Sequence, residues 1–177
     1  MVSIEWDKGF TLIELIVVMA ILGILATIAI VAVNPTEQLA KARDASRISS
    51  ITQLGGSLES YHSSNVGVYP QSPSTTWMNI LVSHGDLRGE VVNASYNSGN
   101  GCNDMAVLGQ NGFCYNNGSI DTIIYAKLEA WVHNRNCTSA PNTRAYWVYS
   151  TSKGKACGVC AQESTDPGVA SSIICSF

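Results

Sequence analysis

Residues 10–33 read FTLIELIVVMAILGILATIAIVAV, and this run decides how the chain is built. It carries a single charge, Glu14, and only two further polar side chains, Thr11 and Thr27. A helix of this length, rising about 1.5 Å per residue, would be roughly 36 Å long, more than the apolar core of a bilayer requires. We therefore expect a membrane-spanning helix, which argues against a purely cytosolic globular protein.

The composition supports one compact domain besides this helix. The chain has 177 residues, of which 46% are hydrophobic and 13% charged, about half the charged share of an ordinary soluble domain. This hydrophobicity excludes intrinsic disorder. Net charge is −3, and the basic run at residues 41–47 is interrupted by Asp44, so the charge does not support DNA binding. Any such binding is expected at Arg135, Arg144, Lys153 and Lys155.

Four segments are expected along the chain: a leader at 1–9, the apolar helix at 10–34, the amphipathic second part of the long helix at 35–62, and a head at 63–177. Asn34 breaks the first helical pattern because a residue before proline is pushed out of helical geometry. Pro35 suits the first turn of a new helix, with Asn34 as its cap. Gly55 and Gly56 weaken that helix, which predicts close packing of another segment against it.

The head is expected to be loop-rich up to residue 119, where Gly, Asn, Ser and Pro dominate. Strands are predicted at 122–132 and at 144–151, the second from its alternating aromatic residues, with a short one at 172–177. The predicted fold class is α+β, a long N-terminal helix packed on a small antiparallel sheet with long, disulfide-stapled loops. Core packing is expected for Trp77, Trp131 and Trp147.

All six cysteines follow the apolar segment, and this even count predicts disulfides in an oxidising compartment. The Cys157-Gly-Val-Cys160 motif also allows a thiol oxidoreductase or a metal site, but the residues after it do not look helical. Cys102 and Cys114 are too far apart in sequence to supply a second zinc-binding pair. We predict the pairing 102–114, 137–157 and 160–175, which staples local loops and uses Cys102, Cys114, Cys137, Cys157, Cys160 and Cys175.

The lone carboxylate of Glu14 helps to distinguish three interpretations of the apolar run: a secretory signal peptide, a plain membrane anchor and a segment with a specific partner for this charge. A secretory signal peptide would have a shorter apolar stretch and a small-residue cleavage site. A plain membrane anchor gains nothing from a carboxylate, which costs about 3 kcal/mol at a helix centre. Residues 9–15, GFTLIEL, resemble the cleavage and methylation motif of type IV pilins and of the related type II secretion pseudopilins. The resemblance extends through Gly23.

This resemblance implies a role for each matching residue. Gly9 would be the last leader residue before the cut, and Phe10 the N-methylated new N-terminus. Glu14 would pair with the N-terminus of a neighbouring subunit, because an isolated charge in hydrocarbon is expensive; a carboxylate snorkelling to the membrane edge is the alternative. Many members have a proline where this chain has Val31, so helix flexibility is expected between Gly23 and Pro35.

The function implied is a structural subunit of a type IV pilus-like surface filament, not an enzyme and without a cofactor. Its partners would be other pilin subunits, a prepilin peptidase/N-methyltransferase, the pilus assembly platform, and the inner membrane before assembly. The precursor would lie in the cytoplasmic membrane and the mature chain on the cell surface. Some related pseudopilins bind calcium in a C-terminal loop, which makes Glu163 and Asp166 weak candidate ligands.

Three alternatives stay open at this point. The chain could be a pseudopilin of a type II secretion or DNA-uptake system. It could be a membrane-anchored thiol-redox or metal-binding domain, which predicts free thiols. It could also be a monomeric, anchored binding module that keeps its leader, for which Glu14 would be dispensable.

Overall fold

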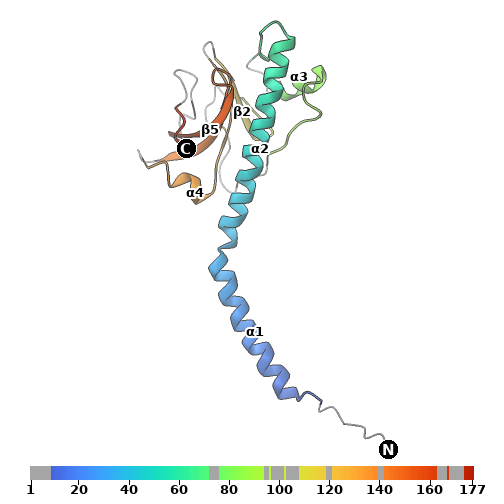
Figure 1. The fold of residues 1–177 in the computed structure, drawn as a ribbon, viewed down its shortest axis with the longest axis vertical. Coiled ribbons are helices and arrows are strands. Elements are labelled where there is room, and N and C mark those ends of the chain that lie inside the picture. The colour runs from blue at the N-terminus through green and yellow to red at the C-terminus, as the bar shows by residue number, and fades with distance from the viewer. Residues whose placement is uncertain are drawn as a thin grey trace, which may run out of the picture. The chain divides into compact units, whose positions relative to one another are not determined.

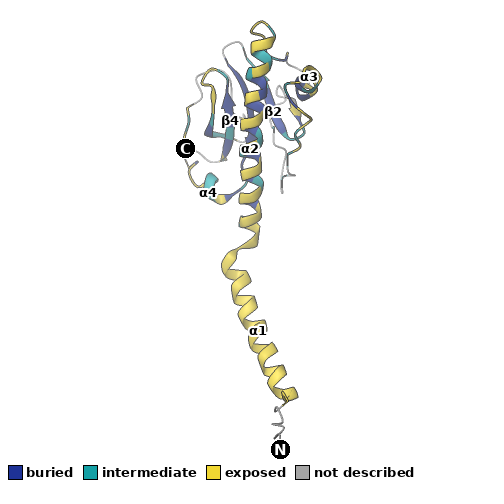
Figure 2. Ribbon diagram, turned by 45° about the vertical axis from the view of Figure 1, so that its right-hand side comes forward, coloured by how far each residue is buried: buried dark blue, intermediate teal, exposed yellow. Residues whose placement is uncertain are grey.

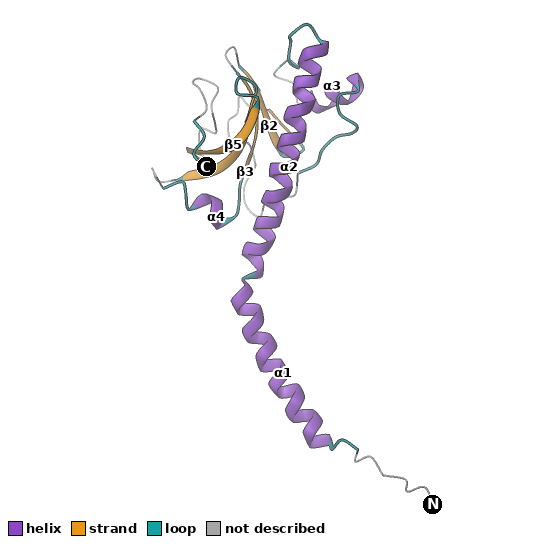
Figure 3. Ribbon diagram, viewed as in Figure 1, coloured by secondary structure: helices purple, strands orange, loops and turns teal. Residues whose placement is uncertain are grey.

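A computed structural model describes residues 9–71, 76–93, 96, 102, 108–118, 121–138, 142–162, 167 and 174–177. The chain divides into two compact units, Met1–Gln38 and Leu39–Phe177. From here on the head means the second unit, which extends the head predicted at 63–177 by residues 39–62. Helices and strands are distinguished in Figure 3. The fold is α+β, as predicted.

The N-terminal unit contains helix α1, Leu12–Val33, which begins at the cap residue Thr11. None of its residues is buried, as the continuous yellow of the helix in Figure 2 shows. The helix ends at Asn34, whose left-handed φ of 46° interrupts the helical hydrogen bonding. This confirms the apolar helix and its predicted break.

Helix α2, Pro35–Ser64, is also confirmed and ends two residues beyond the predicted boundary. The side-chain oxygen of Asn34 accepts a hydrogen bond from the backbone N–H of Glu37 at 3.4 Å, so Asn34 caps α2 as expected. Within the head, α2 lies across one face of the β-sheet (Figure 2) and packs on it through the apolar side chains Ile51, Leu54 and Leu58.

The sheet is an antiparallel meander in the order β1-β2-β3-β4-β5, of which Figure 1 labels β2 and β5. Its strands are β1 Leu108–Gln110, β2 Phe113–Asn117, β3 Thr122–Lys127, β4 Thr143–Ser150 and β5 Lys155–Gln162. Because strand side chains alternate between faces, Tyr115, Ile124 and Tyr149 point to α2 while Tyr125 and Val148 form a second cluster on the other face. Helix α3, Trp77–His84, completes the first core with Trp77, Met78 and Leu81.

Several strand predictions need correction. The strand at 144–151 is confirmed as β4, but the one predicted at 122–132 ends at Lys127, and the short helix α4, Trp131–Asn134, follows. Strands β1 and β2 lie in a segment predicted to be loop. At the C-terminus, the described residues 174–177 form no strand, although Ser176 and Phe177 exchange backbone hydrogen bonds with Gly158 at the edge of β5.

One of the three predicted disulfides is confirmed and two are wrong. Cys102 pairs with Cys114 as predicted, but Cys137 pairs with Cys160 and Cys157 with Cys175. The physical reason is strand geometry: Cys157 and Cys160 lie three residues apart on β5 and therefore point to opposite faces. Cys160 clusters with Cys137 on one side, and Cys157 with Cys175 on the other.

One predicted close approach to α2 is confirmed. A Cβ atom added at the buried Gly55 would lie only 2.4 Å from the ring of Tyr149 on β4. At Gly56, which is exposed, an added Cβ would meet nothing within 4 Å. The close approach of the Tyr149 ring therefore explains why position 55 is a glycine, whereas the prediction of close packing is wrong for Gly56.

Candidate functional site

The start of α1 is organised by Thr11 and Glu14. The hydroxyl of Thr11 accepts a hydrogen bond from the N–H of Glu14 at 3.3 Å. The carboxylate of Glu14 accepts in return from the N–H of Thr11 at 3.2 Å and from its hydroxyl at 2.9 Å. This reciprocal pair is a capping box, and it places a negative charge at the positive end of the helix dipole. This box was not predicted above, although Thr-x-x-Glu at 11–14 is its usual sequence signal.

Apart from Glu14 and Thr27, the surface of α1 is apolar. The helix has 22 residues, about 33 Å of length, which matches the hydrocarbon core of a bilayer. Phe10, before its start, is 81% exposed. The hydroxyl of Thr27 is satisfied within the helix, because it donates a hydrogen bond to the backbone oxygen of Gly23 at 2.9 Å. None of the residues of α1 is buried by the described part of this unit, and by length and composition the helix could cross a membrane.

Comparison with known families now bears on this segment. A family model described as the prokaryotic N-terminal methylation motif, typical of type IV prepilins, matches residues 7–30. The chain carries a prepilin-type N-terminal segment. Searches against characterised proteins and solved structures return no significant match. A prepilin-type segment implies processing by a prepilin peptidase, polymerisation in general, and membrane anchoring of the precursor, and the proteins that carry it are structural.

The prepilin-type segment contains Gly9, Phe10, Glu14 and Gly23, whose individual roles stay predictions. The structure places Phe10 directly before the capping box and Gly23 in the middle of an uninterrupted α1. The observed break is at Asn34, next to Pro35, rather than at Gly23. In the structure, helix α1 therefore continues through Gly23 to its end at Val33.

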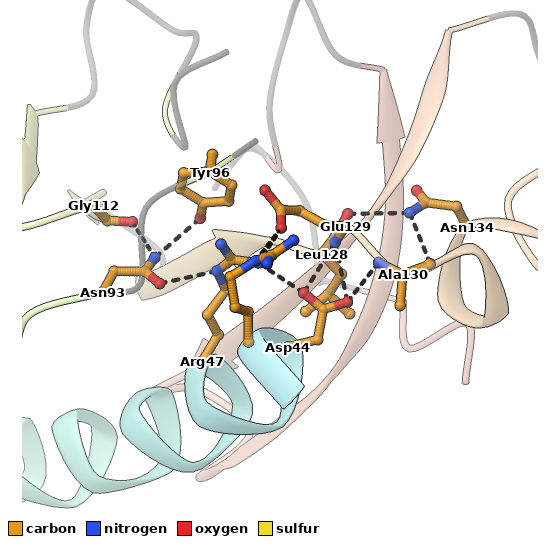
Figure 4. A network of polar contacts seen from close by, with 10 residues as sticks. Asp44, Arg47, Asn93, Tyr96, Gly112, Leu128, Glu129, Ala130 and Asn134 are labelled. Carbon is orange, nitrogen blue, oxygen red and sulfur yellow. Dashed lines mark hydrogen bonds and ion pairs between the residues drawn. The ribbon is translucent and has the colours of Figure 1, made fainter. Parts of the chain in front are cut away.

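The head contains a buried ionic network that was not predicted from the sequence (Figure 4). Asp44 and Arg47 on α2 are 0% and 1% exposed and form an ion pair at 2.8 Å. The carboxylate of Asp44 also accepts from the backbone N–H groups of residues 129 and 130, at 2.8 to 3.0 Å. The guanidinium of Arg47 donates to Asn93 at 2.9 Å and lies 4.0 Å from the ring centre of Tyr96.

This network fixes where β3 ends and α4 begins. A buried ion pair contributes stability only when its remaining polar atoms are satisfied, and here the carboxylate of Asp44 is surrounded by donors. Burial raises the pKa of Tyr96, although the charge of Arg47 opposes that shift. Asp44, Arg47 and Ile51 follow one another at helical spacing, so the inward face of α2 was visible in the sequence; the basic run at 41–47 obscured it.

All six cysteines of the head are paired in disulfides. The three disulfides use all six cysteines of the chain, so the free thiols required by a thiol oxidoreductase or by a cysteine metal site are missing. Among the described residues, no group of three His, Cys, Asp or Glu side chains is placed to hold a metal ion. The candidate calcium ligands Glu163 and Asp166 lie outside the described residues.

The tryptophans and the basic residues are only partly as expected. Trp77 is buried and stacks on Tyr115, with ring centres 5.0 Å apart, and Trp147 packs against the core. The prediction of core packing was wrong for Trp131, which is 65% exposed on α4.

The four basic residues named for DNA binding do not form one patch. Lys155 pairs with one end of β4 and Arg144 lies near the other, about 20 Å away along the strand.

Proposed function

We propose that the chain is a structural subunit of a type IV pilus-like surface filament, cleaved after Gly9, N-methylated at Phe10 and polymerised through α1. The observation that carries this proposal is the match to the methylation motif at residues 7–30, most of which lies on α1, a helix with no buried residue and with Glu14 as its single charged side chain. Such a surface is stable only when lipid or other apolar helices cover it.

The capping box supports the assembly role of Glu14. Cleavage after Gly9 would place a positively charged amine on Phe10, one residue before Thr11, whose N–H already binds the Glu14 carboxylate. The end of the helix would then carry one positive and one negative group in apolar surroundings. Pairing these groups between neighbouring subunits removes much of the cost of each charge and selects one axial register.

We favour a surface filament over a secretion pseudopilin because of the head. Three disulfides hold its loops, which suits a subunit exposed outside the cell. The precursor would wait in the cytoplasmic membrane, where the prepilin peptidase/N-methyltransferase and the assembly platform act on it. Mature subunits would form a homopolymer.

The first test is the intact mass and N-terminal sequence of protein sheared from the surface of the native host. We expect chains that start at N-methylated Phe10. Chains that still start at Met1, found only in membranes, would refute the proposal.

A second test separates the charge of Glu14 from its capping role. Glutamine also forms capping boxes, so Glu14→Gln removes the charge while keeping the hydrogen bonds. We expect this variant to be cleaved and to remain in the membrane without forming filaments. Glu37→Gln, which removes a charge just outside the apolar run, is the matched control and should assemble. Normal filaments from Glu14→Gln would leave Glu14 only as a helix cap.

A further inference from the structure

The loop after α2 holds a valine in a backbone conformation that valine disfavours. Four described non-glycine residues have positive φ, and three are asparagines, the residue type that tolerates it: Asn34, Asn111 and Asn142. The fourth is Val66, at φ 54°. A β-branched residue there is an outlier, and such strain persists only where the surrounding structure enforces it.

The surrounding hydrogen bonds do enforce it. The N–H of Asn65 donates to the oxygen of Tyr61 at 2.9 Å, and that of Gly67 to the oxygen of His62 at 3.0 Å. The N–H of Val68 closes the turn on the oxygen of Asn65 at 3.1 Å. The side chain of Val66 is nevertheless 97% exposed. A fixed loop therefore presents a strained apolar side chain to solvent, where asparagine or glycine would fit better. We call residues 65–68 the tip loop.

The opposite end of the head also exposes a large apolar side chain. Trp131 on α4 is 65% exposed, with the guanidinium of Arg135 at 5.4 Å from its ring centre. Helix α4 is tied to α2 at Asp44, whereas the tip loop follows the last residue of α2, Ser64. Twenty residues of helix correspond to about 30 Å, so the two sites lie at opposite ends of α2 in the head (Figure 1).

The charges around the two sites differ in sign. Exposed Lys41 and Arg135 lie at the α4 end of the head. At the tip, Glu59 and Asp86 outnumber Arg88, and Asp86 is held near the tip by a hydrogen bond from Ser60 at 2.5 Å. Electrostatic complementarity favours contact between opposite ends of two copies and disfavours contact between two tips.

We propose that the tip loop of one copy docks, through Val66, against Trp131 on α4 of a second copy. The contact joins two different surfaces of the same chain, so it is heterologous and can repeat without closing into a ring. It rests on the proposed filament function, and it adds a head-to-head contact separate from the packing of α1.

Photo-crosslinking tests the contact directly in assembled filaments of the full chain. With p-benzoylphenylalanine in place of Trp131, we expect a crosslink to the tip loop, residues 65–68, of another copy, identified by mass spectrometry. The same group in place of the exposed Lys153, on the β4–β5 turn, is the control and should not label the tip loop. Crosslinks from position 131 only to lipid, to another protein or to other parts of the chain would overturn the contact.

A substitution at Val66 distinguishes docking from a purely structural role. Val66→Asn relieves the backbone strain, so the full chain in detergent should unfold at a higher denaturant concentration than the wild type. If Val66 docks, the same variant should yield about tenfold less filament, as expected from the loss of one modest apolar contact. A stabilised chain that assembles as well as the wild type would overturn the proposal. Absence of filaments from the wild-type chain would instead refute the filament function itself.

Discussion

The two adjacent glycines of α2 allow a matched test of how the head is packed. Replacing either by alanine should gain about 1 kcal/mol from better helix propensity and a less flexible unfolded chain. At Gly56 an added Cβ meets nothing within 4 Å, so Gly56→Ala should stabilise the head by most of that amount. At Gly55 the added Cβ would lie 2.4–2.6 Å from three ring carbons of Tyr149.

The clash at Gly55 can be given a magnitude. Carbon atoms pack best at about 3.5–4.0 Å, so the Tyr149 ring would have to move by about 1 Å or more. Tyr149 is buried in the main core, and its hydroxyl donates to Glu59 at 3.4 Å, which limits this movement. Overpacking of this kind costs about 1–3 kcal/mol. Because the helix-propensity gain is common to both variants, we expect Gly55→Ala to be less stable than Gly56→Ala by that amount.

The measurement is urea unfolding of the full chain in detergent, followed by tryptophan fluorescence, with the two alanine variants compared to the wild type. The slope of unfolding free energy against urea should stay constant, so that midpoint shifts report stability alone. Tyr149→Leu combined with Gly55→Ala should recover part of the loss, since the smaller side chain leaves room for the methyl group. Equal midpoints for the two single alanine variants would refute the packing of Tyr149 on α2.

Three further predictions concern ionisable groups in the head. Asp44→Asn should destabilise it by about 3 kcal/mol in urea unfolding, because buried Arg47 then keeps only its longer charged contact, with Glu129 at 3.5 Å. Glu37→Gln, which removes a charge from a partly exposed side chain at the start of α2, should cost much less. Burial tends to raise the pKa of Asp121, but three hydroxyls and a backbone N–H donate hydrogen bonds to its carboxylate, and the net effect is a lowered pKa. Its contribution to the free energy of unfolding should therefore be present above about pH 4 and be lost as pH falls through the pKa of the folded state. Asp121→Asn should reduce this loss of stability at acid pH. Burial raises the pKa of Tyr149 to about 12. Its contribution to the free energy of unfolding should therefore be fully present below about pH 10 and be lost as pH rises through about 12. Tyr149→Phe should remove this part of the loss of stability at alkaline pH.

The two long helices, α1 and α2, could be predicted because their signals are local, whereas α3 lies in a segment predicted to be loop-rich and α4 at the end of a predicted strand. The apolar run, Asn34-Pro35 and the spacing of Ile51, Leu54 and Leu58 each lie within a few residues of the feature they specify. Strand β4 could be predicted for the same reason, from its alternating aromatic residues. Strands β1 and β2 were missed because both are short and joined by an Asn-Gly turn in a polar segment.

The disulfides and the ionic network could not be predicted because they depend on register between distant segments. Cys157 and Cys160 look equivalent in the sequence, and only their positions on β5 separate them by face. Asp44 binds residues 85 and 86 positions later in the chain, which no local pattern specifies. The prepilin-type motif, by contrast, could be predicted, because it consists of neighbouring residues and does not depend on tertiary structure.

The two kinds of contact proposed for the filament differ in what drives them. Lipid tails are as apolar as the side chains of α1, so moving this helix from the bilayer into a bundle of its own copies gains little from the hydrophobic effect. Close packing and polar pairing must then favour the filament, and Glu14 is the one charged residue of α1 available for pairing. The head faces water, where covering Val66 and Trp131 gains hydrophobic free energy that the membrane segment cannot supply. On this argument, α1 determines the register of assembly, while contacts of the head supply part of the free energy that makes leaving the membrane favourable.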